Sequence, residues 1–301
     1  MNRKGTMTLA KRKAGIDFRV SLVFILPALF FMALYIFYPI VESVLISLTK
    51  WNGLTADKEF IGLANWKALI VDEKFWRAFL NNIVVMVLSL AVQMPFAVLL
   101  ATILSIIGRK GKAFKILWFL PNLMSSVAVG FLFKYAFSAT DGIFSTISMA
   151  LGHGRVDLLG DPHWALPTVI LVICWQYIPF YMVYYMAAYS GISGELYEAA
   201  IIDGANKPAY FFKIALPLLK PAIRNACILS MVGSLKYFDL IFVMTNGGPG
   251  EATELMATYM YKLSFKQFNL SYGSTVAVGM LIVITIFATL VMRIFRRKET
   301  D

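Results

Sequence analysis

Gln176, Tyr177 and Phe180 lie in the middle of a long apolar stretch, where polar and aromatic groups are typical of a solute-binding site. Gln176 and Phe180 are four residues apart and share one helix face. Pro179 is expected to open the helix between them, because proline removes a backbone hydrogen bond. Aromatic rings stack on the C–H face of a sugar and amides bond its hydroxyls, so we predict a sugar site. Packing between helices, with a hydrogen bond for Gln176, is the alternative.

A second polar group lies in the next apolar stretch. Ser230, Ser234 and Tyr237 are spaced by four and three residues, which makes one polar stripe on a helix. We expect this stripe to meet the first group in one cavity near the membrane midplane; tighter helix packing is the alternative. Lys236 and Asp239 are predicted to form a buried ion pair on the opposite face. Their alternative role is contact with a charged substrate, such as a glycerol phosphate head group.

The sequence contains no group of residues typical of an enzyme. His153 and His163 stand in a loop rich in Gly and Asp, where solvated histidines are expected. Cys174 and Cys227 lie inside apolar stretches, which favours neither a disulfide framework nor a metal site. The sequence lacks the Gly-x-x-x-x-Gly-Lys-Ser/Thr loop that cradles nucleotide phosphates. We therefore predict no catalytic residue, no metal, no cofactor bound by this chain and no ATPase activity of its own.

Residues 191–220 form a charged insert, punctuated by glycine and proline, between two apolar stretches. Gly191 and Gly194 are expected to end the preceding helix, and Ser193 to cap a new one. Gly204 is expected to stop the new helix, and Asn206 to start a second short one. The pattern predicts a helix-turn-helix at the membrane surface.

This insert resembles the EAA loop of binding-protein-dependent ABC importer permeases. The family pattern is Glu-Ala-Ala, three residues, Gly, nine residues, Ile, one residue and Leu-Pro. It falls without a gap on Glu198, Ala199, Ala200, Gly204, Ile214, Leu216 and Pro217. In the family, the loop enters a cleft of a separate ATPase subunit and transmits ATP-driven closure. The resemblance implies ATPase-coupling roles for Glu198, Ala199, Ala200, Asp203 and Gly204. Both alanines are expected on one face of the helix, where another surface can approach closely.

Two further segments make the chain similar to sugar and glycerol-phosphate importer permeases: residues 60–66, FIGLANW, and 246–249, NGGP. The resemblance implies a permease that forms half of a translocation pathway for a sugar or oligosaccharide. It also implies a heterodimer with a second six-span permease, two ATP-binding cassette subunits that hold ATP and Mg, and an extracellular solute-binding protein. The predicted pocket positions match those that hold sugar in maltose-type permeases, although the side chains in the fifth apolar stretch differ.

Two alternatives remain open on the sequence. One is an importer of glycerol-3-phosphate or another polyol. The other belongs to a different class, a stand-alone secondary transporter or channel, which should show an inverted repeat and intramembrane acids for ion coupling. The two halves of the sequence show no such repeat, and Glu42 and Asp239 are its only clear acids within apolar stretches.

The composition is that of a membrane protein. Hydrophobic residues make up 59% of the chain and charged residues 15%, with a mean hydropathy of +0.71; soluble domains carry about 45–50% apolar and about 25% charged residues. Crossing a bilayer core takes about 20 apolar residues as a helix. Since lipid cannot satisfy backbone groups, we predict an all-α polytopic membrane protein with six transmembrane helices. The six stretches are residues 20–48, 80–107, 115–137, 164–190, 221–245 and 272–295.

Most Lys and Arg residues flank these stretches on the side that holds both termini, which favours cytoplasmic termini and a cytoplasmic insert. The net charge of +11 is thus explained by topology, and no nucleic-acid partner is expected. The resemblance implies a multi-pass protein of the bacterial inner membrane. We divide the chain into a basic cytoplasmic tail at 1–19, a permease domain at 20–295 with the coupling loop at about 191–220, and a cytoplasmic C-terminal tail at 296–301.

Overall fold

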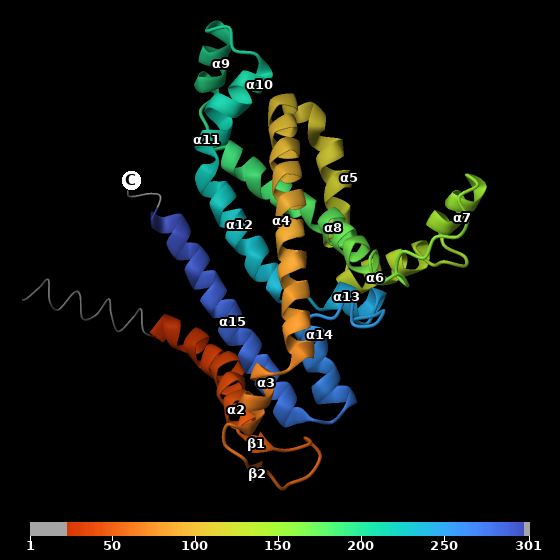
Figure 1. The fold of residues 1–301 in the computed structure, drawn as a ribbon. Helices are drawn as coiled ribbons and strands as arrows, with labels where there is room; N and C mark the ends of the chain where they lie inside the picture. The colour runs from red at the N-terminus through yellow and green to blue at the C-terminus, as the bar shows by residue number, and fades with distance from the viewer. Residues whose placement is uncertain (1–22, 298–301) are drawn as a thin grey trace, which may run out of the picture.

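The computed structural model describes residues 23–297, and most of this range is helical (Figure 1). Four helices in it are long and apolar enough to cross a membrane. Two bent pairs of shorter helices raise that number to six if each pair is counted as one span. The all-α prediction is confirmed, whereas the count of six depends on the bent pairs. The four continuous spans are Val23–Ser47, Glu73–Ile107, Ala165–Tyr189 and Leu270–Arg293.

The elements follow one another in this order. The first half holds η1 (Ala33–Phe37), α2 (Tyr38–Ser47), β1 (Thr49–Lys50), β2 (Glu59–Phe60), α3 (Ala64–Ile70), α4 (Glu73–Ile107), η2 (Gly108–Gly111), α5 (Lys112–Leu123), α6 (Ser126–Ala136) and α7 (Ile143–Ala150). The second half holds α8 (Ala165–Tyr189), α9 (Gly194–Ile202), α10 (Lys207–Tyr210), η3 (Phe211–Ala215), α11 (Leu216–Leu218), α12 (Lys220–Leu235), α13 (Asp239–Met244), α14 (Met256–Tyr261), η4 (Lys262–Lys266) and α15 (Leu270–Arg297).

Two of the predicted spans are not straight helices. The stretch 115–137 is divided between α5 and α6, which are bent by 93°. The stretch 221–245 is divided between α12 and α13, because the chain leaves the helix after Leu235. A second bend, of 68°, separates α12 from the helical segment Lys207–Leu218.

The second span begins at Glu73, seven residues before the predicted start. Asp72 caps this helix, because its carboxylate accepts hydrogen bonds from the backbone N–H groups of Lys74 (3.0 Å) and Phe75 (3.3 Å). The same carboxylate accepts the hydroxyl protons of Tyr259 (2.7 Å) and Tyr272 (2.6 Å). Asp72 therefore ties the start of α4 to α14 and α15.

The core forms where α4 packs along α8 and α12 (Figure 1). Ala97 and Ala101 on α4 are fully buried, and small residues at these positions let the helices approach closely. Ile173, Met182 and Tyr185 of α8 fill the same interior. These helices form the scaffold on which the polar residues described below are held.

The two ends of the bundle carry different elements (Figure 1). At one end, β1 and β2 form a short antiparallel hairpin in which Thr49 pairs with Phe60 and Lys50 with Glu59. At the opposite end, α9 and α10 project beyond the long helices. The insert predicted at 191–220 thus lies at the opposite end from the predicted outer loop that contains the hairpin.

Two helical segments have much uncovered apolar surface. The apolar window of Val23–Ser47 contains no buried residue, although its C-terminal half, α2, packs beside α15. Helix α7 stands out from the bundle (Figure 1). The predicted tail at 1–19 and residues 298–301 lie outside the described range. Residues 296–297 of the predicted C-terminal tail belong to α15.

Candidate functional site

The chain leaves helical geometry between α12 and α13, inside the apolar stretch 221–245. Helix ends carry unpaired carbonyls, which must find partners when they are buried. Here the side-chain amide of Asn82, on α4, donates to the carbonyls of Ser234 (3.2 Å) and Leu235 (3.3 Å). The Asn82 carbonyl oxygen accepts from the N–H of Met256, the first residue of α14 (3.0 Å). One buried amide thus fixes the break and the helix that follows.

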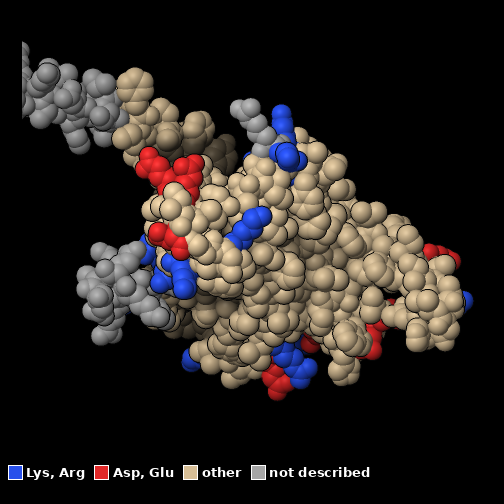
Figure 2. Space-filling view, turned by 90° about the horizontal axis from the view of Figure 1, so that it is seen from above, with Lys and Arg blue, Asp and Glu red and all other residues tan. Residues whose placement is uncertain are grey.

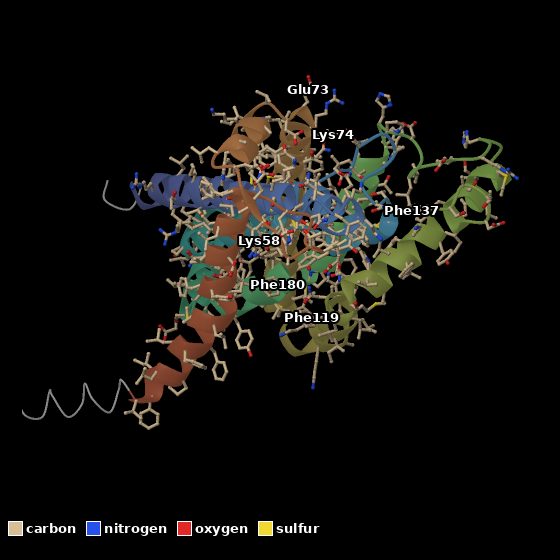
Figure 3. All side chains as sticks on the ribbon, turned by 90° about the horizontal axis from the view of Figure 1, so that it is seen from below. Lys58, Glu73, Lys74, Phe119, Phe137 and Phe180 are labelled. Atoms are coloured by element: carbon tan, nitrogen blue, oxygen red, sulfur yellow. The ribbon has the colours of Figure 1, made fainter. Side chains whose placement is uncertain are left out.

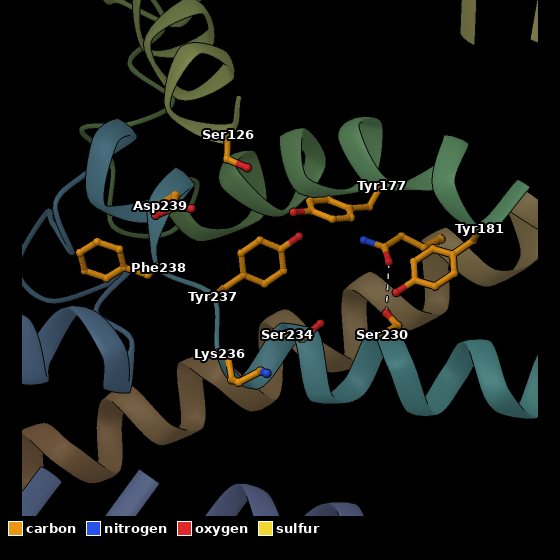
Figure 4. Close-up of a pocket in the computed structure, with 11 residues that line it drawn as sticks. Ser126, Tyr177, Tyr181, Ser230, Ser234, Lys236, Tyr237, Phe238 and Asp239 are labelled. Carbon is orange, nitrogen blue, oxygen red and sulfur yellow. Dashed lines mark hydrogen bonds between the residues drawn. The ribbon is translucent and has the colours of Figure 1, made fainter. Parts of the chain in front are cut away.

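A cavity of about 350 Å³ lies at this break (Figure 4). Its size falls at the low end of the roughly 300–1,000 Å³ typical of small-molecule sites. Side chains of α4, α6, α8, α12 and α13 reach it, together with the three residues of the break itself. The lining consists of Gln93, Ser126, Tyr177, Tyr181, Ser230, Gly233, Ser234, Lys236, Tyr237, Phe238 and Asp239.

The lining combines aromatic faces with hydrogen-bonding groups. The rings of Tyr177 and Tyr237 meet edge to face, with centroids 5.7 Å apart at 86°. Ser230 donates to the side-chain oxygen of Gln93 at 3.2 Å (Figure 4). Rings that stack on C–H faces, beside amide and hydroxyl groups that bond to hydroxyls, can bind a polyhydroxylated solute.

Four of the six predicted substrate-binding residues come together in this cavity: Tyr177, Ser230, Ser234 and Tyr237. The prediction that all six converge is wrong for Gln176 and Phe180. Phe180 is 41% exposed on α8 (Figure 3) and packs edge to face on Tyr181, with ring centroids 5.1 Å apart.

Gln176 instead supports the bend between α5 and α6. Its amide donates to the carbonyl of Met124 (3.3 Å) and to the hydroxyl of Ser126 (3.4 Å). Its own backbone carbonyl accepts from the side chain of Asn122 (3.3 Å). The expected opening at Pro179 is also wrong, since α8 runs through it without interruption. The backbone departs from the helix at α5–α6 and α12–α13 instead.

Lys236 and Asp239 do not form the predicted buried ion pair. Both are exposed and both line the cavity, and no ion pair joins them. The sequence placed both residues opposite the polar stripe because it assumed one continuous helix. The break at residues 236–238 instead turns both residues toward the stripe. The cavity therefore carries one cationic and one anionic side chain.

Sequence reasoning missed several residues of the site. Gln93 is one of them, and its side-chain oxygen accepts a hydrogen bond from Ser230, another residue of the cavity. Tyr181 continues the aromatic side of α8 one turn after Tyr177, a spacing that the sequence contains. Asn82, a buried amide in an apolar stretch, carried the same signal as Gln176.

The insert folds as the predicted helix-turn-helix. The Ser193 hydroxyl accepts from the N–H of Glu195 (3.3 Å), and the Asn206 side chain accepts from the N–H of Ala209 (2.9 Å). Gly204 follows the end of α9 with φ +81°, a conformation that favours glycine. Gly191 directly follows Ser190, the C-cap of α8, whereas Gly194 was wrongly expected to end that helix and is the first residue of α9.

The exposed surface of the insert contains most of the predicted coupling residues. Glu198, Ala199, Asp203 and Gly204 are exposed, whereas Ala200 is buried. Ala199 and Ala200 therefore do not share one open face. Nearby Tyr197 and Tyr210 pack edge to face with centroids 4.9 Å apart, which holds α9 on α10. Side chains of both charges stand on the end of the molecule that includes this insert (Figure 2), and Glu195, Lys207 and Lys213 are exposed there as well.

Large apolar side chains also stand open on this element. Ile202, next to Asp203, is 85% exposed, and Phe212 in η3 is 64% exposed. Apolar surface outside the long apolar helices is typical of a contact with another protein. The insert thus presents exposed apolar side chains at the tip of the bundle.

No group of three or more His, Cys, Asp or Glu side chains that could hold a metal ion occurs within residues 23–297. At the end of the bundle that carries the β1–β2 hairpin, the carboxyl of Asp72 has a displaced pKa. Burial raises it, but the hydroxyls of Tyr272 and Tyr259 and two backbone N–H groups together lower the pKa below its ordinary value. The ionised Asp72 carboxylate therefore anchors the start of α4 through these hydrogen bonds.

Residues 76–301 match the family model described as binding-protein-dependent transport system inner membrane component. The chain is 31% identical over 283 residues to the lactose transport system permease protein LacF of Rhizobium radiobacter, covering 92% of this chain and 94% of that protein. It is 29% identical over 306 residues to the trehalose/maltose transport system permease protein MalF of Thermococcus litoralis, covering 99% and 100%. Its fold matches, with a TM-score of 0.82, a chain of a bacterial alginate ABC transporter solved in complex with an alginate pentasaccharide-bound periplasmic protein. That match has 23% identity and covers 95% of this chain and 96% of that chain.

The chain belongs to the family of inner membrane components of binding-protein-dependent transport systems. It is a permease of an ABC importer, with several membrane-spanning helices in the inner membrane. The alternative of a stand-alone transporter or channel does not fit this membership.

Proposed function

We propose that this chain forms half of the translocation pathway for a sugar or oligosaccharide and couples that pathway to a separate ATPase. The observation that supports it most is the cavity at the helix break. Non-helical backbone within a membrane span is tolerated where it is buried in protein or lines a solvated cavity. Here the break supplies Lys236, Tyr237 and Phe238 to the lining itself.

The sugar class is favoured by the chemistry of the lining and by the relatives. Tyr177, Tyr237 and Phe238 present aromatic rings beside the hydroxyls of Ser230 and Ser234. The names of two relatives specify lactose and trehalose/maltose transport. Glycerol-3-phosphate or another polyol phosphate would need more cationic groups than Lys236 alone, which stands beside Asp239.

The coupling role rests on the insert. We propose that the exposed residues Glu198, Ala199, Asp203 and Gly204 contact an ATP-binding cassette subunit, and that buried Ala200 holds their helix in place. ATP and Mg would be held by that partner, so this chain is not itself an enzyme. A second permease would complete the pathway as a heterodimer, and an extracellular binding protein would deliver the solute. This arrangement has both termini and the insert in the cytoplasm.

The cavity assignment is tested by Tyr237→Ala and Ser234→Ala, with Tyr135→Ala as the matched control. Tyr135 is 73% exposed on α6 and does not line the cavity. Losing one hydrogen bond costs about 0.5–1.5 kcal/mol, which corresponds to roughly a 2- to 12-fold rise in the KM for uptake.

Uptake is measured in proteoliposomes that contain the full transporter, using labelled sugars that its binding protein retains. The two cavity variants should lose affinity while ATP hydrolysis still responds to the binding protein. Equal KM values for Tyr237→Ala, Ser234→Ala and wild type would show that the cavity does not bind the transported sugar.

A further inference from the structure

Four aromatic rings continue from the cavity in an unbroken series, which we call the aromatic strip. Phe238 stacks on Phe242 with centroids 4.9 Å apart, and both rings contact Tyr261, at 5.4 and 5.0 Å. Tyr261 in turn contacts Phe265 at 5.3 Å. The strip therefore joins the break, α13, α14 and η4.

The strip begins in the cavity and ends at the outer side of the molecule. Phe238 lines the cavity (Figure 4). Phe265 lies in η4, whose following loop leads into α15 beside the outer hairpin: the N–H of Ser271 donates to the carbonyl of Trp51 (3.1 Å). The series of rings thus runs from the binding cavity toward the side where a solute would arrive.

The strip is not part of the packed interior. The buried side of α14 is filled by Met256, Ala257, Thr258 and Tyr259, and the Tyr259 hydroxyl is used by Asp72. Tyr261 is half-buried, and its hydroxyl makes no hydrogen bond to any residue in the described range. Phe265 is 58% exposed. The exposed ring of Phe265, the partly exposed rings of the other three residues and the unbonded Tyr261 hydroxyl are accessible to a ligand.

We propose that the aromatic strip is an outer extension of the sugar site that holds further rings of an oligosaccharide while its leading ring occupies the cavity. This inference rests on the proposed function and specifies its substrate as a chain of two or more sugar rings. Contacting ring centroids are 4.9–5.4 Å apart, and the accessible parts of the rings offer apolar surface to the C–H side of a pyranose. A single sugar that fits the cavity would leave Tyr261 and Phe265 without a ligand.

The test compares Phe265→Leu and Tyr261→Leu with Phe60→Leu in the complete transporter. Leucine keeps apolar volume and removes the aromatic face. Phe60 is the matched control, because it is a 74% exposed phenylalanine of the outer hairpin and not part of the strip. Uptake is measured with labelled glucose, maltose, maltotriose and maltotetraose, and with lactose, cellobiose, xylose, xylobiose and xylotriose.

For sugars of two or more units, both strip variants should raise the KM by about 2- to 10-fold per ring removed, while Phe60→Leu changes nothing. Uptake of single-unit sugars and stimulation of ATP hydrolysis by the binding protein should stay at wild-type levels. The proposal would be overturned if the wild-type transporter took up only the single-unit sugars, or none of the sugars in the panel. Equal losses for short and long sugars, or failure of the two permeases to assemble, would instead identify the strip as a protein contact. Tyr237→Ala tests the cavity separately, so loss of the strip's role would leave the cavity assignment intact.

Discussion

A substitution at Gly204 tests the proposed coupling role of the insert without disturbing the packing of the long helices. Gly204 has φ +81°, and no atom lies within 4 Å of the position that a Cβ would take. A new side chain therefore meets no obstacle, and its local cost is that of the left-handed conformation, about 1–2 kcal/mol. Asp tolerates this region better than most residues, so Gly204→Asp should cost about 1 kcal/mol. That corresponds to roughly a fivefold change in the equilibrium of the turn.

Any loss of transport beyond fivefold must come from the added charge at the docking surface. We expect Gly204→Asp to abolish ATP-driven uptake in proteoliposomes while the chain still inserts normally into the membrane. The matched control is Gly152→Asp, which has the same φ of +81° and the same open surroundings but lies in the predicted outer loop. Wild-type uptake by Gly204→Asp, or equal losses in both variants, would refute the coupling assignment.

Two further predictions concern Asn82, which holds the break between α12 and α13, and Asp72, which anchors the start of α4. Asn82→Ala removes three buried hydrogen bonds and should destabilise the chain by about 3 kcal/mol, which is measured as a lower unfolding temperature in detergent. The control is Asn81→Ala, which should cost less because Asn81 is only part-buried. An equal loss of stability in both variants would contradict the role of Asn82. Asp72 has a lowered folded-state pKa, so its stabilisation is complete above the ordinary value of 3.8 and is lost as pH falls from there through the folded-state pKa. The difference in unfolding temperature between wild type and Asp72→Asn should shrink over that acidic range, and a difference that grows would contradict the assignment.

Local signals predicted the insert well, because its determinants are neighbours in the sequence. Ser193 and Asn206 cap helices through N–H groups two and three residues away. Gly204 supplies a conformation that a turn needs at one position. The apolar stretches could be predicted equally well, since a membrane span is recognised from the length and composition of one continuous segment. These features require no knowledge of what packs against them.

The site was harder to predict because it depends on where helices break. Asn82 stabilises the break after α12 from 152 residues away in the sequence, and no local signal marks that partner. Once the helix breaks, the residues after it change face, which moved Lys236 and Asp239 into the cavity. Gln176 looked like a ligand group but satisfies carbonyl and hydroxyl groups at a bend 50 residues or more away. Periodicity assigns faces only within a continuous helix.

The central claim is that this chain is a pathway subunit driven by an ATPase on another chain. Its most direct test is reconstitution of this chain with its partner permease, the ATP-binding cassette subunits and the binding protein in sealed vesicles, followed by omission of each component. We predict that sugar uptake needs every component and ATP, and that the purified chain alone neither binds nor hydrolyses ATP. Sugar uptake without the ATPase subunits, or ATP hydrolysis by this chain alone, would contradict the account.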